Sequence, residues 1–417
     1  MSAEPAEVSV RAEPEAIGWA VVALAFLAVL LDGFDAAALA VVVPTLARAW
    51  AFSPAAFTVP LVLTNIGVVL GYLCSGWLAA RLGRRRLLTG GVALFAVATL
   101  GVALLLPLES MAVLTGLRLV TGLGLGAVLP AAVSLATAHS PTRRRELVAV
   151  IVTLGLTSGA TLGGFFGGRL LLTVGADGVF WVAGLLPLLL TGLLAWRMSE
   201  PAAVGARGAA TDEARLARLF TPELRMNTAL LWTFAFLVFV AAYTLTSWVP
   251  TLLTSYGFSP TRAPLGLAFV SFGGLLGGIA LIPLAARIGI ARALILMPAI
   301  GVACMLVVSR AELGDTALLL LLGGAGAGVV SSQIGQLTMA VSLYSTGART
   351  TGLGWASALG RAGSIVGPGI AGILIGLALP GKDILLLTAV PVLVAAACAV
   401  LLWRRSRAPA AQTDGGP

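Results

Sequence analysis

Residues 78–88 read LAARLGRRRLL, and residues 284–294 read LAARIGIARAL, 206 positions later. Each stretch is a short basic connection between two long apolar runs. A second string, Val43-Pro44-Thr45-Leu46, recurs as Val249-Pro250-Thr251-Leu252 at the same spacing. These matches predict that the chain is built from two related halves.

Glycines repeat in the same order between the two halves. Gly159, Gly163 and Gly168 recur 204 positions later as Gly363, Gly367 and Gly372. Gly124 and Gly126 match Gly326 and Gly328 at a spacing of 202. Two parallel repeats are typical of transporters in which two halves rock about a central site.

The composition places the chain in a membrane. Of 417 residues, 59% are hydrophobic and only 10% are charged, with a mean hydropathy of +1.03. Soluble domains carry about 25% charged residues, so a soluble fold is excluded. The net charge of +9 comes mostly from arginines between apolar runs, whereas a nucleic-acid-binding protein gathers its basic residues in a patch.

Twelve apolar runs are long enough to cross a bilayer, which takes roughly 20 helical residues. They are continuous rather than alternating, so the fold class is an all-α membrane protein with two six-helix bundles. The runs are 17–46, 56–82, 86–107, 110–138, 146–173, 178–198, 227–254, 263–287, 290–308, 315–343, 350–377 and 383–403.

Arginines cluster in every second connection, and cytoplasmic connections carry the excess of such residues. Both termini are therefore predicted to be cytoplasmic, in a multi-pass protein of the bacterial inner membrane. The domains follow as an N-terminal tail, a bundle, a linker, a second bundle and a C-terminal tail, at 1–16, 17–198, 199–226, 227–404 and 405–417.

The side chains leave little room for catalysis or metal binding. Cys74, Cys304 and Cys398 lie far apart within apolar runs, without the spacing of metal ligands. The single histidine, His139, stands at a predicted helix end. We therefore expect no enzyme activity, metal or cofactor.

Two motifs resemble the major facilitator superfamily. Gly76, Arg81, Gly83 and Arg84 fall on its Gly-x-x-x-Asp-Arg-x-Gly-Arg loop, and the string from Arg118 to Gly126 is similar to its Arg-x-x-x-Gly-x-Gly-x-Gly motif. The resemblance implies that the basic loops gate the cytoplasmic side; the candidate gating residues are Gly76, Arg81, Gly83, Arg84 and Arg349. The acidic position of the loop is Ala80 here, and Ala138 and His139 replace a second acidic residue. Without the first carboxylate, a weaker cytoplasmic latch between the halves is expected.

Two further strings are similar to the aromatic acid:proton symporters. These are Asp32-Gly33-Phe34-Asp35 in the first run and the stretch from Arg349 through Trp355 to Arg361 in the eleventh. The resemblance covers nearly all of the membrane-spanning chain. It implies an aromatic acid as substrate and protons as the coupling ion.

Four charged residues are expected at bilayer depth, where each costs at least about 2.5–3.5 kcal/mol and marks a functional site. Asp32 and Asp35 share a helix face, and either could take up and release a proton, with Asp35 favoured because it lies within reach of Arg118. Arg118 is expected to tune the aspartates, and its counter-ion is either Asp35 or the substrate's carboxylate. Arg361 is expected to hold the substrate anion, since a guanidinium binds a carboxylate through two hydrogen bonds. Structural salt bridges remain the alternative for both arginines.

A cavity around these charges needs aromatic and polar walls. The candidates for substrate contact are Phe34, Asn65, Tyr243, Trp248, Gln333, Gln336 and Trp355, with Thr153 and Thr157 as further polar candidates.

The sequence thus predicts a transporter that imports an organic, aromatic carboxylic acid with protons by alternating access. The alternative is a proton-driven exporter of drugs or metabolites with the same fold. Such exporters carry a Gly-Pro pair in the fifth span, where this chain has Gly163-Gly164. The expected partners are a small carboxylate, protons and membrane lipid, with no nucleic acid, and the protein is expected to be a monomer.

Overall fold

Long helices account for most of the chain in the computed structural model, which describes residues 16–198, 218–222, 224–344 and 346–407. The predicted N-terminal tail, most of the linker 199–226 and most of the C-terminal tail lie outside the described residues, as does the side chain of Arg349. Among the described residues, eleven helices are long and apolar enough to cross a membrane.

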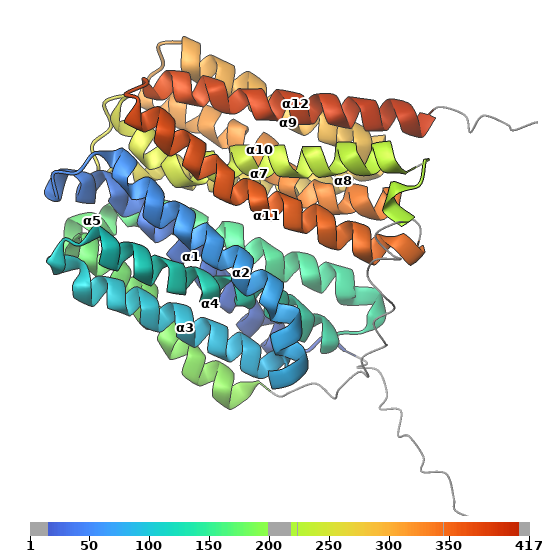
Figure 1. The fold of residues 1–417 in the computed structure, drawn as a ribbon, viewed down its shortest axis with the longest axis horizontal. Coiled ribbons are helices and arrows are strands. Elements are labelled where there is room, and N and C mark those ends of the chain that lie inside the picture. The colour runs from blue at the N-terminus through green and yellow to red at the C-terminus, as the bar shows by residue number, and fades with distance from the viewer. Residues whose placement is uncertain (1–15, 199–217, 223, 345, 408–417) are drawn as a thin grey trace, which may run out of the picture.

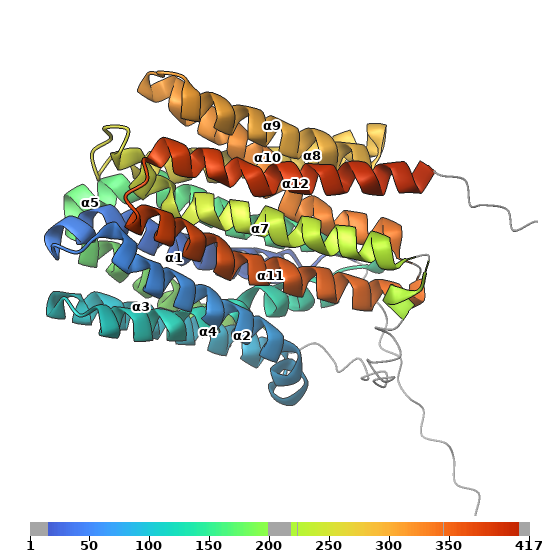
Figure 2. The same cartoon turned by 45° about the horizontal axis from the view of Figure 1, so that its top comes forward.

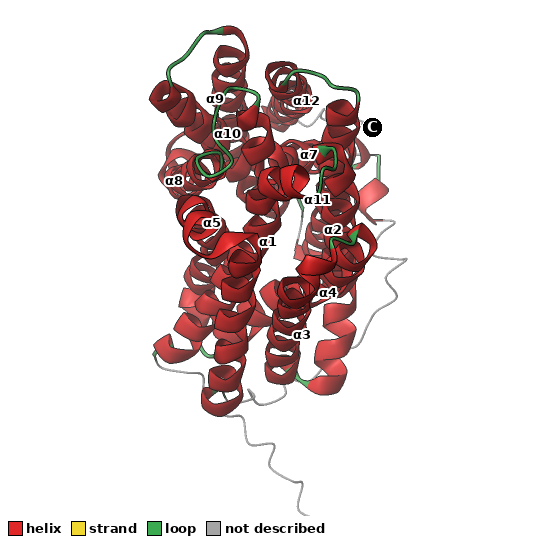
Figure 3. Cartoon of the chain, turned by 90° about the vertical axis from the view of Figure 1, so that its left-hand side faces the viewer, coloured by secondary structure: helices red, strands yellow, loops and turns green. Residues whose placement is uncertain are grey.

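The helices fall into two groups in space, one drawn below the other in Figure 1. The first group holds α1 (Trp19–Ala49), α2 (Thr58–Leu82), α3 (Arg84–Leu105), α4 (Met111–Ala138) and α5 (Arg145–Arg197). The second holds α7 (Arg225–Thr254), α8 (Pro264–Ile288), α9 (Ile290–Arg310), α10 (Asp315–Leu343), α11 (Thr346–Gly376) and α12 (Gly381–Arg407). The helices run roughly parallel to one common direction, as the end-on view of Figure 3 shows.

Helix α5 covers the fifth and sixth predicted runs. Its 53 residues would extend about 80 Å if straight, far more than a bilayer's thickness. The helix breaks at Gly175, whose φ of 78° and ψ of −177° are not helical. Glycine adopts such a positive φ without the clash that a Cβ would cause. The two predicted runs thus lie on either side of this glycine.

Helix pairs within each group approach closely through glycine, and the pairs repeat between the groups. A Cβ at Gly159 of α5 would collide with the backbone of Leu30 and Phe34 in α1. A Cβ at Gly363 of α11 would collide with the backbone of Phe236 and Val240 in α7, 206 positions after the α1 partners. The two halves therefore share one packing scheme, as the sequence repeat predicts.

The contacts correct the register of the repeat in α4 and α10. Gly122 faces the carbonyl oxygen of Thr64, and Gly326 faces that of Val270, its counterpart at a spacing of 206. Gly326 therefore corresponds to Gly122 and not to Gly124, at a spacing of 204 rather than 202. The predicted spacing was wrong because Gly-x-Gly-x-Gly in α4 matches Gly-x-Gly in α10 in two registers.

The two groups meet at the end of the bundle opposite the 199–226 linker, which we call the loop end. Here Gly168 of α5 is close to Thr261, before α8, and Gly372 of α11 is close to Thr58 at the start of α2. Figure 2 shows α2 and α11 side by side, in agreement with their contacts. The opposite end, where the linker leaves the bundle, we call the linker end.

Candidate functional site

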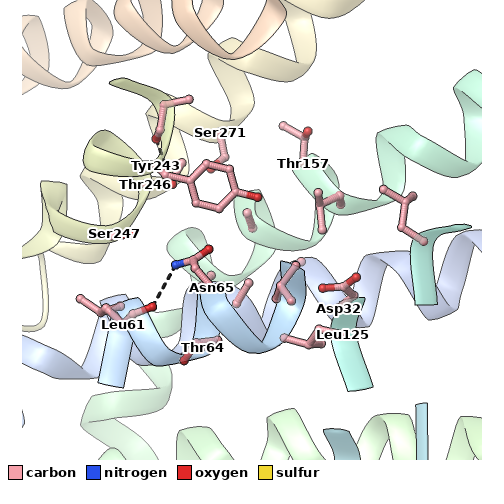
Figure 4. Close-up of a pocket in the computed structure, with 18 of the residues that line it drawn as sticks. Asp32, Leu61, Thr64, Asn65, Leu125, Thr157, Tyr243, Thr246, Ser247 and Ser271 are labelled. Atoms are coloured by element: carbon pink, nitrogen blue, oxygen red, sulfur yellow. Dashed lines mark hydrogen bonds between the residues drawn. The ribbon is translucent and has the colours of Figure 1, made fainter. Parts of the chain in front are cut away.

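A cavity of about 140 Å³ lies between the two groups. Residues of α1, α2, α4, α5, α7, α8, α10 and α11 line it, so both halves contribute (Figure 4). An apolar cavity of about 150 Å³ accommodates one benzene molecule. The space therefore suits a ligand with a single ring.

The lining follows the two-fold relation between the halves. Seven pairs of residues that correspond in the repeat, at a spacing of 206 or 204, have both members in the cavity lining. The pairs are Ala36 and Ala242, Ala37 and Tyr243, Leu61 and Leu267, Asn65 and Ser271, Gly126 and Val330, Leu129 and Gln333, and Thr157 and Arg361. The cavity thus lies on the axis that relates the halves. Within several pairs only one member is polar. The positions that line the cavity are therefore symmetric, but their side chains are not.

Asp35 and Arg118 form a salt bridge beside this cavity, with 3.0 Å between Asp35 Oδ2 and Arg118 Nη1. Both side chains are fully buried. Thr99 donates a hydrogen bond of 2.6 Å to Asp35 Oδ1, and Arg118 Nε donates one of 3.3 Å to Thr64 Oγ1. Of the two counter-ions considered for Arg118, the structure pairs it with Asp35.

The second half has no such charge pair at the corresponding positions. The counterparts of Asp35, Arg118 and Thr99 are Ala241, Leu322 and Met305. All three are apolar and lie in the buried core. The buried charge pair is therefore a property of the first half.

Asp32 lies one helical turn from Asp35 and faces the cavity. It is buried, with 7% of its surface exposed. Among the described residues, no hydrogen bond or ion pair joins Asp32 to another side chain, whereas Asp35 is held by two partners. Asp32 is thus the carboxyl group that a proton or a ligand in the cavity can reach.

Arg361 lines the opposite wall, from the middle of α11. Its Nη1 donates a hydrogen bond of 3.2 Å to the hydroxyl of Tyr243, and its guanidinium carbon lies 5.3 Å from the centre of the Tyr72 ring. Among the described residues, no carboxylate forms an ion pair with Arg361. Its remaining donors can therefore hold an anionic ligand.

The structure brings part of the predicted wall to the cavity. Asn65, Tyr243, Gln333 and Thr157 line it, as do Asp32, Arg118 and Arg361. Figure 4 shows Asn65 and Thr157 near Tyr243, and Asp32 farther along the cavity.

Other predicted contact residues lie outside the lining because each has a partner or a place elsewhere. Trp248 is fully buried and donates from Nε1 to Pro368 O at 3.0 Å, which joins α7 to α11. Trp355 stacks on Trp232 with ring centres 5.8 Å apart. Phe34 belongs to the hydrophobic core, and Gln336, 1% exposed, lies among the buried residues of α10.

Thr153 also lies outside the cavity lining, and its hydroxyl donates to Ala149 O within α5. The cavity instead includes polar residues that sequence reasoning missed, namely Thr64, Thr246, Ser247 and Ser271. Serine and threonine occur in many spans here and mostly bond to their own helix, as Thr246 does to Ala242. Residue type alone therefore gave no signal for these four.

The predicted gating loop between α2 and α3 lies at the linker end. Gly83 ends α2 with a φ of 89°, and its counterpart Gly289 ends α8 with a φ of 86°. Arg81 lies over the Trp77 ring at 4.1 Å, and Arg84 donates to Ser134 O near the end of α4. The C-terminus of a helix attracts cations. The C-terminal part of α4 therefore binds Arg84, the first residue of α3. Gly76 has open space around its Cα.

Comparison with known proteins agrees with this architecture. The sequence profile of the Major Facilitator Superfamily matches residues 25–340. A gallate transporter of Pseudomonas putida is 32% identical over 414 residues, covering 92% of this chain and 91% of the relative. A 4-hydroxybenzoate transporter of Pseudomonas aeruginosa is 32% identical and covers 94% of both chains.

The fold is also similar to that of a solved transporter. The crystal structure of a D-xylose-proton symporter superposes with a TM-score of 0.75 at 16% identity, covering 93% of this chain and 97% of the other. At that identity the likeness concerns the fold alone.

Proposed function

The chain belongs to the major facilitator superfamily, and from this premise we propose that it imports an aromatic carboxylic acid together with protons, by alternating access. It is a membrane transport protein and not an enzyme. The two relatives named above are transporters of aromatic acids, which supports the substrate class. The proposal adds the coupling ion and the direction.

The observation that carries the proposal is the pair of opposite charges on the cavity wall. Arg361 has donors free to hold a carboxylate, and Asp32 has an unpartnered carboxyl group in the same cavity. In the proposed cycle, an ionised Asp32 balances the charge of Arg361 before the acid binds. When a monoanionic acid binds Arg361, the balance is restored only if Asp32 takes up a proton. One proton then accompanies one acid molecule.

The membrane potential favours this coupling. Moving a monoanion into a cell that is negative inside costs about 2.3 kcal/mol per 100 mV. A proton carried with the acid removes this cost, and the proton gradient drives accumulation. Linkage requires that proton and acid raise each other's affinity by the same factor.

In this proposal the Asp35 and Arg118 pair holds α1, α3 and α4 together. The sequence favoured Asp35 as the proton carrier, whereas this proposal assigns that role to Asp32. The reason is that Asp35 is fully buried and already shared between Arg118 and Thr99.

The proposed topology has twelve spans in two six-helix domains, with α5 counted as two spans divided at Gly175, and both termini and the linker in the cytoplasm. The arginines at the linker end support this orientation. The loop end then faces outward, and the close contacts there correspond to a closed outer side. We place the protein in a bacterial inner membrane, as a monomer surrounded by lipid.

Reconstituted vesicles test the proposal. With the outside made acidic, labelled 4-hydroxybenzoate should accumulate, and a protonophore should abolish the accumulation. Asp32→Asn should remove the response to the gradient while exchange of internal for external acid continues. Asp177→Asn, at an exposed position beside the α5 break, is the matched control and should behave as wild type.

An exporter makes the opposite prediction. If label accumulates only when the inside is acidic, the import proposal is wrong. The alternative of a drug or metabolite exporter would then be favoured.

A further inference from the structure

Two buried polar atoms of the cavity wall have no partner. Among the described residues, eight buried side-chain nitrogen or oxygen atoms make no hydrogen bond. Two of these atoms, Arg118 Nη2 and Ser271 Oγ, belong to residues that line the cavity. A buried polar group left without a partner costs about 1–3 kcal/mol. Ser271 is only 1% exposed, so the protein maintains an unsatisfied hydroxyl at the edge of its own binding space.

Asn65 presents a second group to the same cavity. Its Nδ2 donates to Leu61 O at 2.9 Å. Because a carbonyl oxygen can only accept, this bond fixes which side of the amide carries nitrogen. Asn65 Oδ1 therefore points away from Leu61 and remains able to accept a hydrogen bond, as Figure 4 shows.

Asn65 and Ser271 are counterparts in the two-fold repeat, at a spacing of 206. Of the paired lining positions, this pair and that of Thr157 with Arg361 are polar in both halves. A hydroxyl donor and an amide acceptor on α8 and α2 are complementary to a ligand hydroxyl, which both donates and accepts.

The position of the pair relative to Arg361 suits the two ends of a ring. The Arg361 guanidinium lies against Tyr72, seven residues after Asn65 in α2. Seven helical residues correspond to about 10 Å along the helix axis. The α2 residue that Arg361 contacts, Tyr72, is therefore nearer the linker end of α2 than Asn65 is.

We propose that Ser271 and Asn65 form a hydroxyl-binding end of the cavity and restrict the substrate to aromatic acids with a ring hydroxyl remote from the carboxylate. The carboxylate binds Arg361, the ring lies between the apolar walls, and the hydroxyl meets Ser271 Oγ and Asn65 Oδ1. This inference rests on the proposed function, since it requires an aromatic acid in this cavity.

The reason for selectivity is the state of the pair when the hydroxyl is missing. Benzoate would leave Ser271 and Asn65 unsatisfied and shielded from water. Sites built to bond a substrate hydroxyl discriminate strongly against the analogue that lacks it.

The test is binding of benzoate and 4-hydroxybenzoate to the purified full-length protein, by competition with a labelled acid. Wild type should bind 4-hydroxybenzoate at least about tenfold more tightly than benzoate. Ser271→Ala and Asn65→Ala should each weaken 4-hydroxybenzoate binding by roughly tenfold relative to benzoate binding, so that the preference shrinks toward one.

The matched control is Ser332→Ala. Ser332 is equally buried on α10, but its hydroxyl bonds to Gly328 O of its own helix, and it does not line the cavity. This variant should keep the wild-type preference, and thermal unfolding of all three variants identifies any loss of folding. If Ser271→Ala does not fold, Asn65→Ala decides the question alone.

Two outcomes overturn the inference in different ways. If wild type binds both acids equally, or if Asn65→Ala and Ser271→Ala keep the preference, the hydroxyl-binding end is wrong while the proposed function stands. If neither acid binds at all, the proposed function fails and the inference fails with it.

Discussion

Asp35 and Arg118 show how a buried ion pair acts at the scale of single residues. Each charge alone would be costly in a membrane interior, and the pair is tolerated because the two charges compensate each other and the hydroxyls of Thr99 and Thr64 add one hydrogen bond to each side chain. Such a pair contributes little net stability relative to apolar residues, but removing one partner leaves an uncompensated charge. The pair therefore fixes how α1, α3 and α4 fit together.

We expect Asp35→Asn to lower the free energy of unfolding by about 3–5 kcal/mol, since Arg118 loses its counter-ion in a fully buried site. Thermal unfolding in detergent measures the effect. Asp315→Asn is the control: it breaks the exposed pair with Arg262 and should cost less than about 1 kcal/mol. The double variant Asp35→Asn with Arg118→Gln should recover part of the loss; a double variant as unstable as the single one would contradict this explanation.

Arg361→Lys tests the proposed carboxylate site. Lysine keeps the positive charge but lacks the planar fork that gives two parallel hydrogen bonds. We expect affinity for 4-hydroxybenzoate to fall by tenfold or more, measured by competition binding. Arg262→Lys, on the exposed surface near the loop end, should have no effect. Unchanged uptake by Arg361→Lys would remove the assignment.

Glycine determines how helices of the two halves meet at the loop end. Gly168 in α5 and its counterpart Gly372 in α11 both face a threonine of the other half, Thr261 and Thr58. Small residues let helix backbones approach closely in membranes, where lipid gives no hydrophobic drive for association. These two contacts between the halves thus depend on the absence of a side chain at Gly168 and at Gly372.

We expect Gly168→Ala to weaken closure of the loop end, because the new Cβ would collide with the carbonyl oxygen of Thr261. In a Ser247→Cys background, which places a thiol in the cavity wall, the variant should raise the rate of labelling by an impermeant thiol reagent from the loop side. Gly192→Ala is the control, since Gly192 lies on α5 with open space around it. Equal labelling rates for the two variants would show that the contact between Gly168 and Thr261 does not limit access of the reagent to the cavity.

The whole molecule combines a symmetric frame with asymmetric chemistry. Counterpart residues line the cavity from both halves, but the aspartates are found in the first half and Arg361 in the second. Because the proposed proton site belongs to the first half and the proposed anion site to the second, relative movement of the halves can change the access of both at once.

The proposed orientation gives a prediction for the whole chain. A fluorescent protein fused to the C-terminus should fluoresce, and alkaline phosphatase fused there should be inactive, since the arginine-rich end stays in the cytoplasm. Phosphatase inserted after Ser259, in the connection between α7 and α8, should be active. An active C-terminal phosphatase fusion would reverse the topology.

Most of the helices could be predicted from the sequence, because each has to satisfy its own backbone hydrogen bonds in lipid and so appears as a continuous apolar run. The predicted run 110–138 differs by one residue from α4, Met111–Ala138. The break at Gly175 lies between the predicted runs 146–173 and 178–198, so hydropathy indicates the interruption, and only the structure shows that a single glycine conformation makes it.

The site divides in a similar way. The sequence alone singles out four charged residues, because a charge inside an apolar run is costly in a membrane and indicates a function. These residues are Asp32, Asp35, Arg118 and Arg361. Ser271 could not be singled out, since a hydroxyl in a span usually bonds to its own helix. Its missing bond is visible only in three dimensions.

The sequence by itself determined that this is a membrane protein with two related halves and a few charges at depth, because composition, periodicity and repeats are local properties of the chain. Only the tertiary structure decided which aspartate is paired with Arg118 and which faces the cavity. It also decided the register of the repeat and which polar residues line the cavity from each half. These depend on contacts between residues far apart in sequence, and side-chain type alone does not specify which partner each will find.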